Sequence, residues 1–422
     1  MFETLKNAWK ITELRRKILF TIVMLFVFRL GGFIPIPGVD ASAIQAAVGQ
    51  YSALGLMDIM AGGNLGNFTF FALGVGPYIT ASIIMQLLTV AIPKLERLAK
   101  EGEEGSKKIN QWTRICGVVL AFVETIGIIL TFMSQGAIQN NWLNYITIGF
   151  MMAAGSAICM WIGEQITEKG IGNGISLLIF VGIISRVPGA VISSVESMIG
   201  GTMSVWMGLA SIVGVLLLIA IIVYVDNGQR RIPVQYAKRV VGRKMYGGQS
   251  THIPVKVNAS GVLPIIFAIS LVNFPLMIAE FWPQSAFYAW YSRFLNAGSP
   301  LYMIIYGLLI IFFTYFYTTI SFNPIEVSKN LQQNGGFIPG IRPGRPTSDY
   351  LMKVTHRITL FGAIFLALLA VIPSTLTRVL GVTGIASVFT ASGILIAVSV
   401  ALETSKQLES QMIMRNYKGF LK

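Results

Sequence analysis

Few residues of this 422-residue chain are spaced as chemistry at a covalent bond would require. The segment EGEEGSKK, residues 101–108, resembles a phosphate-binding loop, but its Gly-to-Gly-Lys spacing is wrong and no strand precedes it. The segment GIGNG, residues 170–174, lacks the strand–turn–helix context of a dinucleotide site and suits a tight turn. Neither His252 nor His356 has a second ligand at metal-binding spacing. The sequence therefore predicts no enzyme activity, no metal site and no cofactor.

Two ionisable residues, Arg29 and Glu124, lie within apolar segments, where charged side chains are often functional. Arg29 is near one end of its segment, so we expect it to reach the interface or bond a backbone carbonyl. Glu124 suits either a buried polar contact or a pathway residue. A proton- or sodium-coupled transporter normally has more midplane carboxylates than this. Cys116 and Cys159 also lie in apolar stretches and are interpreted as small core residues.

The composition is that of an integral membrane protein. Hydrophobic residues make up 54% of the chain and charged residues only 12%, whereas about a quarter of the residues of a soluble domain are charged. A spanning helix needs about 20 largely apolar residues. Ten segments meet this requirement, and the fifth is the weakest because Arg186 and Pro188 interrupt it. The predicted spans are 18–34, 74–92, 115–133, 145–163, 174–192, 208–225, 261–282, 302–322, 358–378 and 382–402.

Basic residues gather on one side of these ten spans. The two tails and the even-numbered connections carry 28 of the 32 Lys and Arg residues. Arg186, Arg293 and Arg378 fall on the other side, and Arg29 lies inside the first span. Positive charge marks the cytoplasmic side, so both termini are predicted to be cytoplasmic. Five spans before about residue 200 and five after it define two halves, 1–200 and 201–422. An odd number of spans inverts the second half, and inverted halves usually build a pathway at their interface.

Three connecting segments have unusual patterns. LGLMDIMAGGNLGNF, residues 54–68, is too short to cross a bilayer and too apolar for an ordinary solvent loop. Residues 226–258 contain seven basic residues and alternating apolar positions, which predicts a short β-hairpin projecting from the membrane. Residues 323–357 are rich in Gly and Pro turns. A basic surface with aromatic residues suits an acidic protein partner or RNA phosphate.

Six stretches of the chain resemble the bacterial SecY family, whose members are central subunits of protein-translocation channels. They are FRLGGFIPIPGVD (28–40), PYITASIIMQLLTV (77–90), GEQITEKGIGNGISL (163–177), GQRRIPVQYAKR (228–239), QSTHIPVKVN (249–258) and FIPGIRPG (337–344). The resemblance implies an all-α polytopic membrane protein with ten transmembrane helices in two inverted five-helix halves around a central hourglass pore. It also implies a passive, multi-pass channel of the bacterial plasma membrane. Such a channel passes unfolded proteins outward and releases transmembrane segments laterally into lipid.

The resemblance also implies a plug and a pore ring. Residues 55–67 would be a short re-entrant plug helix on the outer side of the pore, built from Leu56, Met57, Asp58, Ile59, Met60, Gly62, Gly63, Leu65 and Gly66. A ring of bulky apolar side chains is implied at Val75, Ile79, Ile175, Ile179, Ile266 and Ile396. In the second and fifth spans the ring residues are four apart and therefore share one helix face. β-Branched side chains are stiff, which suits a constriction of defined bore.

A lateral gate and docking surfaces complete the expectation from the resemblance. The second and third spans should face the seventh and eighth, with Thr80, Ser82, Gln86 and Asn273 as polar residues of the gate. The cytoplasmic loops 226–258 and 323–357 would bind the SecA ATPase or the ribosome, chiefly through Arg342, Arg243, Lys244 and Arg239. SecE would clamp the two halves, and SecG would bind peripherally. The remaining implied partners are signal sequences, preprotein chains and membrane lipids.

Two other functions compete with this interpretation. A secondary transporter would show solute uptake coupled to protons or sodium ions. An intramembrane enzyme would need a nucleophile–base pair or a metal-binding spacing, and the sequence contains neither pattern. The motif matches favour the channel over both.

Overall fold

This structure of the whole chain is a computed structural model. It describes residues 8–40, 42–45, 58, 61–134, 136–138, 141–201, 204–236, 239–241, 244–246, 250–279, 282, 285–295, 299–380 and 391–419.

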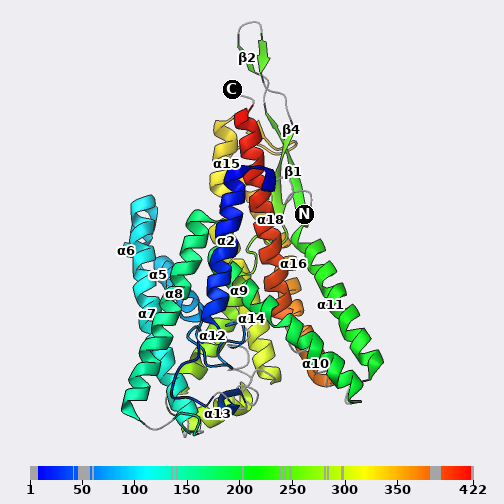
Figure 1. Cartoon of the computed structure of the whole chain (residues 1–422). Helices are drawn as coiled ribbons and strands as arrows, with labels where there is room; N and C mark the ends of the chain where they lie inside the picture. Colours follow the sequence, from blue (N-terminus) through cyan, green and yellow to red (C-terminus); the bar gives the residue numbers. More distant parts are fainter. Residues whose placement is uncertain are drawn as a thin grey trace.

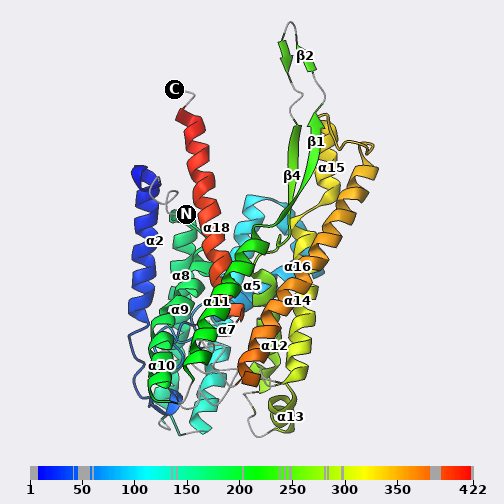
Figure 2. The same ribbon diagram turned by 90° about the vertical axis from the view of Figure 1, so that its right-hand side faces the viewer.

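Long helices form the body of the molecule (Figures 1 and 2). Within the described ranges six helical stretches are long and apolar enough to cross a membrane, or seven if one sharply bent pair counts as a single span. The bent pair is α5 (Gly76–Ala91) and α6 (Pro93–Lys100), which meet at 101°. The six stretches are α7 (Glu103–Ser134), α8 (Trp142–Lys169), α9 (Gly174–Ser185) with α10 (Val187–Ile199), α11 (Val205–Asp226), α14 (Pro300–Ser321) with α15 (Pro324–Gln333), and α16 (Arg345–Leu380).

The other three predicted spans overlap helices that do not meet this test. Helix α2 (Thr12–Gly31) carries Arg15, Arg16 and Lys17 near its start, and α12 (Leu263–Ala279) has only 17 residues. Helix α18 (Ala391–Gly419) is partly polar, and the predicted start of its span, 382–390, lies outside the described residues. The fifth predicted span is broken at Arg186, the residue at which its sequence pattern is interrupted.

Aromatic side chains mark where a membrane would begin and end. On α11, Trp206 and Tyr224 are 81% and 83% exposed and stand eighteen residues apart. At 1.5 Å per residue they are about 27 Å apart along the helix axis, close to the roughly 30 Å hydrocarbon core of a bilayer. On α8, the exposed Trp142 and Trp161 have nearly the same spacing. Exposed Trp and Tyr are typical of the two membrane interfaces, so these helices fit a membrane-embedded protein.

The segment 226–258 forms the β-hairpin predicted from its alternation. Strand β1 (Gln229–Tyr236) pairs antiparallel with β4 (Ser250–Lys256), and β2 (Arg239–Val241) pairs with β3 (Lys244–Tyr246) at the tip. Strand β5 (Gly336–Phe337), from the second long loop, pairs with β1 on its other side. The hairpin projects beyond the helices in Figures 1 and 2, and we call that end of the molecule the hairpin end. Ile232 and Val234 pack with Leu331 and Leu351, so the two loops share one apolar core.

Candidate functional site

The six residues of the predicted ring lie in one apolar core. They come from the start of α5 and from α9, α12 and α18, so both halves of the sequence contribute. Ile175 is partly buried and packs against this core. The buried members are Val75 (5% exposed), Ile79 (7%), Ile179 (1%), Ile266 (5%) and Ile396 (3%).

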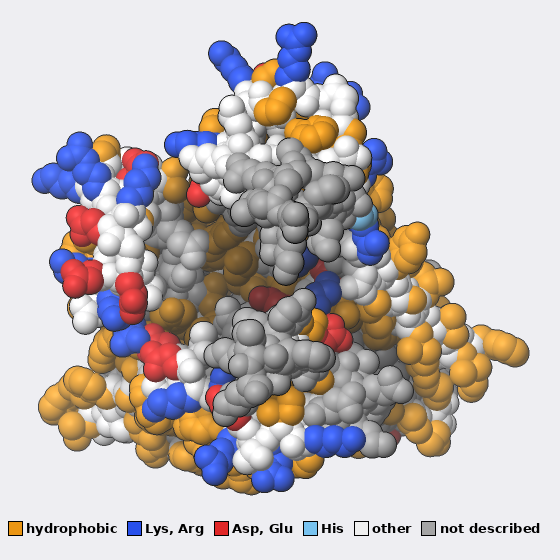
Figure 3. Space-filling view, turned by 90° about the horizontal axis from the view of Figure 1, so that it is seen from above, with side chains coloured by type: hydrophobic (Ala, Val, Ile, Leu, Met, Phe, Trp, Pro, Cys, Tyr) orange, Lys and Arg blue, Asp and Glu red, His pale blue; other side chains and the backbone are white. Residues whose placement is uncertain are grey.

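A cavity of about 650 Å³ opens on the hairpin side of the ring. Ile179, Ile266 and Ile396 line its apolar part, while Asp226 and Lys406 are among its polar lining. Figure 3 shows the molecule from the hairpin end, with a central hollow that has hydrophobic side chains in its depth. The cavity therefore has a polar part and an apolar part, and three of the six predicted ring residues belong to the apolar part.

Polar atoms along the cavity wall need partners. Asn258 Oδ1, Ser260 Oγ and Ser399 Oγ are buried and accept or donate no hydrogen bond within the described part of the chain. Buried polar atoms are normally paired with protein or water, and a cavity of this size can hold many water molecules. The Asn258 amide donates to Asp226 Oδ1 at 3.0 Å, and Lys406 Nζ lies 3.6 Å from Asp226 Oδ2. The polar part of the cavity lining is therefore suited to contact with water or with a hydrated polypeptide.

The described part of the predicted plug lies against α9, on the far side of the ring. Ile179, Gly182 and Arg186 are three and four residues apart, so they follow one another along one face of α9. A Cβ on Gly62 would come within 2.6 Å of the Gly182 Cα, and Gly62 has a φ of +75°. Both facts require glycine at this contact. Predicted plug residues Leu56, Met57, Ile59 and Met60 lie outside the described residues.

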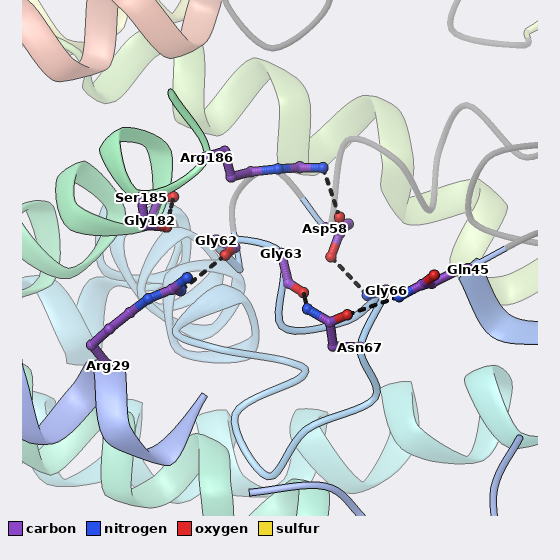
Figure 4. A network of polar contacts seen from close by, with 10 residues as sticks. All are labelled: Arg29, Gln45, Asp58, Gly62, Gly63, Gly66, Asn67, Gly182, Ser185 and Arg186. Carbon is purple, nitrogen blue, oxygen red and sulfur yellow. Dashed lines mark hydrogen bonds and ion pairs between the residues drawn. The ribbon is translucent and has the colours of Figure 1, made fainter. Parts of the chain in front are cut away.

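An ion pair joins the plug to the end of α9 (Figure 4). Arg186 Nη2 lies 3.1 Å from Asp58 Oδ2, and the Gly66 amide donates to Asp58 Oδ1 at 2.7 Å. The Asp58 side chain is 5% exposed and the Arg186 side chain 28%. A carboxylate this deeply buried needs the compensation that the guanidinium and the amide supply. Arg186 was not predicted as a site residue; the available signal was a single Arg, two residues before Pro188, in an apolar stretch.

Further polar contacts hold the plug backbone (Figure 4). Arg29 Nη1 donates to the Gly62 carbonyl at 3.3 Å, which confirms the expectation that Arg29 bonds a backbone carbonyl. The Asn67 amide donates to the Gly63 carbonyl at 3.0 Å, and the Gln45 amide donates to Asn67 Oδ1 at 3.0 Å. These contacts add to those of Asp58 and of the apolar residue Leu65, which is buried in a second core with Phe68. Sequence analysis did not single out Gln45.

The helices of the predicted gate meet across the two halves. Helix α12 contacts both α5 and α7, and the Tyr317 hydroxyl on α14 donates to Gln86 Oε1 on α5. The Gln86 amide in turn donates to Ser82 Oγ at 3.2 Å. We call this contact of α5 and α7 with α12 and α14 the seam. Thr80 bonds only its own helix, donating to the Gly76 carbonyl, and Asn273 is half-buried on α12.

The predicted docking residues are partly described. Arg342 is exposed on a loop whose backbone is fixed: Thr347 Oγ1 donates to the Arg342 carbonyl at 2.8 Å, and Ser328 Oγ donates to the Gly344 carbonyl at 2.7 Å. Arg239 and Lys244 belong to β2 and β3, without described side chains, and Arg243 lies outside the described residues.

Glu124 and His356, which were also considered in the sequence, are not among the residues that line the cavity. Glu124 is 6% exposed on α7. The His356 ring stacks on Tyr315, with centroids 6.1 Å apart. Within the described ranges, no group of three His, Cys, Asp or Glu side chains is placed to hold a metal ion.

Comparison with known proteins gives a consistent result. The family model for SecY matches residues 69–405. The protein translocase subunits SecY of Streptomyces galbus and Halalkalibacterium halodurans are 45% and 44% identical to this chain, over 100% of each chain. A solved protein-conducting channel covers 95% of this chain and 93% of its own at 21% identity, with a TM-score of 0.67. Sec61 from a canine ribosome–channel complex gives a TM-score of 0.60 at 19% identity, with the same coverage.

Proposed function

The chain belongs to the SecY family, and we propose that it is the protein-conducting channel of a Sec translocase in a bacterial plasma membrane. The observation that carries this proposal is the order of three features along α9. A polar cavity opens at the hairpin end, an apolar ring closes it, and a glycine-rich segment lies beyond the ring on α9. An unfolded chain would enter the cavity, part the ring and displace the plug, with no covalent chemistry.

In this proposal ten spans form two inverted halves, 1–200 and 201–422, around an hourglass pore. All ten predicted spans overlap helices, and the ring draws side chains from both halves. Both termini would be cytoplasmic, on the side where 28 of the 32 Lys and Arg residues fall. The hairpin end would then be the cytoplasmic entrance.

The ring would block ions in the resting channel without any charge. An apolar constriction excludes water, and ions do not pass where their hydration is lost. The stiff side chains of Ile79 and Ile266, from opposite halves, would define the bore. A passing chain would take their place, so the seal adapts to different sequences.

The seam would serve as the lateral gate. An apolar signal sequence that wedges between α5 and α12 gains about 25 cal/mol for each Å² of apolar surface it buries. It shifts the closed–open equilibrium only through this difference in affinity. One contact that would hold the gate closed is the hydrogen bond between Tyr317 and Gln86. Interhelical hydrogen bonds of this kind are worth about 0.6 kcal/mol in membranes.

The cytoplasmic loops would receive SecA or the ribosome, with SecE and SecG as further subunits. Two structural relatives are a canine Sec61 in a ribosome–channel complex and a yeast Ssh1 complex bound to the 80S ribosome. Arg342 is exposed on a rigid loop, and Arg can bond a carboxylate or phosphate in a bidentate manner.

Translocation by reconstituted vesicles tests the proposal. With SecA, ATP and a preprotein, the unchanged chain should import the preprotein, and Arg342→Glu should abolish import while the chain still inserts into the membrane. Lys329→Glu, an exposed charge reversal on neighbouring α15, is the matched control and should remain active. Normal import by Arg342→Glu would remove the docking role.

A disulfide engineered between α5 and α12 tests the gate. It should block signal-sequence entry, and reduction should restore it. Continued secretion by the oxidised form would contradict the seam as the entry site.

A further inference from the structure

Helix α13 (Ala286–Phe294) is oriented differently from the long helices. It lies at the end of the molecule opposite the hairpin, across the ends of the long helices (Figures 1 and 2). Ser285 begins it by accepting a hydrogen bond from the Tyr288 amide at 3.1 Å. No step of the proposed channel mechanism uses this helix.

One face of α13 carries three large aromatic side chains. Phe287, Trp290 and Phe294 are three and four residues apart, so they lie on one side of the helix. They are 48%, 48% and 44% exposed and touch one another, with ring centroids 6.4 and 5.9 Å apart. Arg293 flanks this face, its guanidinium 5.6 Å from the Phe294 ring centroid. Contiguous exposed aromatic surface of this kind marks an interaction site.

Helix α13 is attached to α12 through Tyr291, whose ring lies beside Phe287 with centroids 6.3 Å apart. Tyr291 is 2% exposed, and its hydroxyl donates to the Val272 carbonyl at 2.6 Å. This carbonyl lies beside a weakened part of α12, because Pro275 leaves the Leu271 carbonyl without its helical donor. Rotation of α13 about its axis would therefore break this buried bond.

The surroundings of the aromatic face indicate its partner. Close to α13 in the chain, Ile278 at the end of α12 and Leu301 and Ile304 at the start of α14 are exposed apolar residues. At the same end, Trp142 begins α8 and Trp206 lies in the first turn of α11, both exposed. The aromatic face thus continues the lipid-facing surface at the level where exposed tryptophans mark the membrane boundary. An amphipathic helix with Trp and Phe on one face is typical of such an interface.

We propose that α13 is an interfacial anchor whose Phe287, Trp290 and Phe294 enter the headgroup–acyl boundary of the phospholipid leaflet opposite the hairpin. Arg293 then lies level with the lipid phosphates. The Tyr291–Val272 bond connects the depth of the anchor in lipid to α12, the helix that carries Ile266 and Asn273.

Tryptophan quenching by brominated phospholipids tests the proposal. The unchanged chain and Trp290→Phe are reconstituted in phosphatidylcholine–phosphatidylglycerol vesicles with bromine at defined acyl positions. The difference between the two proteins reports Trp290 and requires no other substitution. We expect a blue-shifted Trp290 component that is quenched most by bromine near the headgroup and little by aqueous acrylamide.

Two variants on the same helix sharpen the result. Ala289→Trp combined with Trp290→Phe moves the indole by one residue, off the aromatic face. Quenching of this tryptophan by bromolipid should therefore decrease, and its quenching by acrylamide should increase. Arg293→Glu should reduce bromolipid quenching of Trp290, because the carboxylate is repelled by phosphate. A Trp290 component quenched by acrylamide as strongly as that of Ala289→Trp would overturn the proposal, and so would protection from both quenchers, which indicates contact with protein. Either failure leaves the channel function intact, since vesicle import measures that separately.

Discussion

The ring and the plug lie next to each other along α9, yet they are held by opposite kinds of interaction. Five of the six predicted ring residues are buried in an apolar core, and in the proposed channel they would act through shape alone. The plug is held by an ion pair and by hydrogen bonds to glycine backbone, including those at Gly62 and Gly66. Apolar packing is non-directional, so in the proposed channel the ring would close again around any translocating chain. The polar contacts are few and specific, so we expect the plug to be either fully bound or released.

This difference predicts separate roles. The ring should set how well the resting pore excludes ions, and the plug contacts should set how readily the pore opens. Substitutions in the two regions should therefore differ in the size of their effect and in whether a second substitution can reverse it. A lost ring side chain has no single partner whose change could compensate. A lost plug contact has one.

The largest effect is expected at the ring. Replacing both Ile79 and Ile266 with Asn should raise resting ion conductance at least about a hundredfold, because each position loses about 1.5–3 kcal/mol of apolar burial and admits water. Planar-bilayer recording of the purified chain measures this. Ile79→Val with Ile266→Val keeps the branched apolar shape and should change conductance little. Equal conductance of the Asn and Val forms would contradict the ring.

The second-largest effect is expected at the ion pair between Arg186 and Asp58. Arg186→Gln leaves Asp58 buried without its cation, which costs about 2 kcal/mol of closed-state stability, less than the usual 3–5 because Arg186 is 28% exposed. The open fraction should rise about thirtyfold in the same recordings. Adding Asp58→Asn should restore most of the closure, since two amides need no charge compensation. Additive effects of the two substitutions would show that the pair is not coupled.

A smaller effect is expected from the backbone of the plug. Gly62→Ala places a Cβ at 2.6 Å from Gly182 Cα at a φ of +75°, and the left-handed conformation alone costs about 1–2 kcal/mol. The open fraction should rise about tenfold. Gly63 has a φ of +85° but open space around it, so Gly63→Ala measures the conformational cost alone. Gly66→Ala should change the open fraction little, because its Cβ makes only ordinary contacts. Equal effects of Gly62→Ala and Gly63→Ala would indicate that close approach to α9 is unimportant.

The smallest effect is expected at the seam. Tyr317→Phe removes the bond to Gln86, worth about 0.6 kcal/mol, so gate opening should become about threefold more frequent. The rate of signal-peptide crosslinking to α5 at limiting peptide reports this. Tyr315→Phe, whose hydroxyl contacts the His356 carbonyl away from the seam, is the control. A slower rate in Tyr317→Phe would mean that the bond favours the open gate instead.

Local patterns predicted a good part of the molecule. The alternation of Ile232, Val234 and their neighbours predicted the hairpin, because a half-buried strand has a period of two. The apolar yet glycine-rich segment 54–68 was identified as neither span nor ordinary loop, and Gly62 explains why: its contact with Gly182 leaves no room for a side chain. The break of the fifth span at Arg186 was also visible in the sequence.

By itself the sequence determined that the chain belongs in a membrane, which end is basic and where the hairpin lies. Only the tertiary structure decided that the six predicted ring residues meet in one apolar core, that Arg186 pairs with Asp58, and that Tyr317 bonds Gln86. The physical reason is the solvent. Lipid is as apolar as a protein core, so an Ile that faces the pore and one that faces lipid follow the same pattern along a helix. Partners far apart in sequence meet only after the helices have packed.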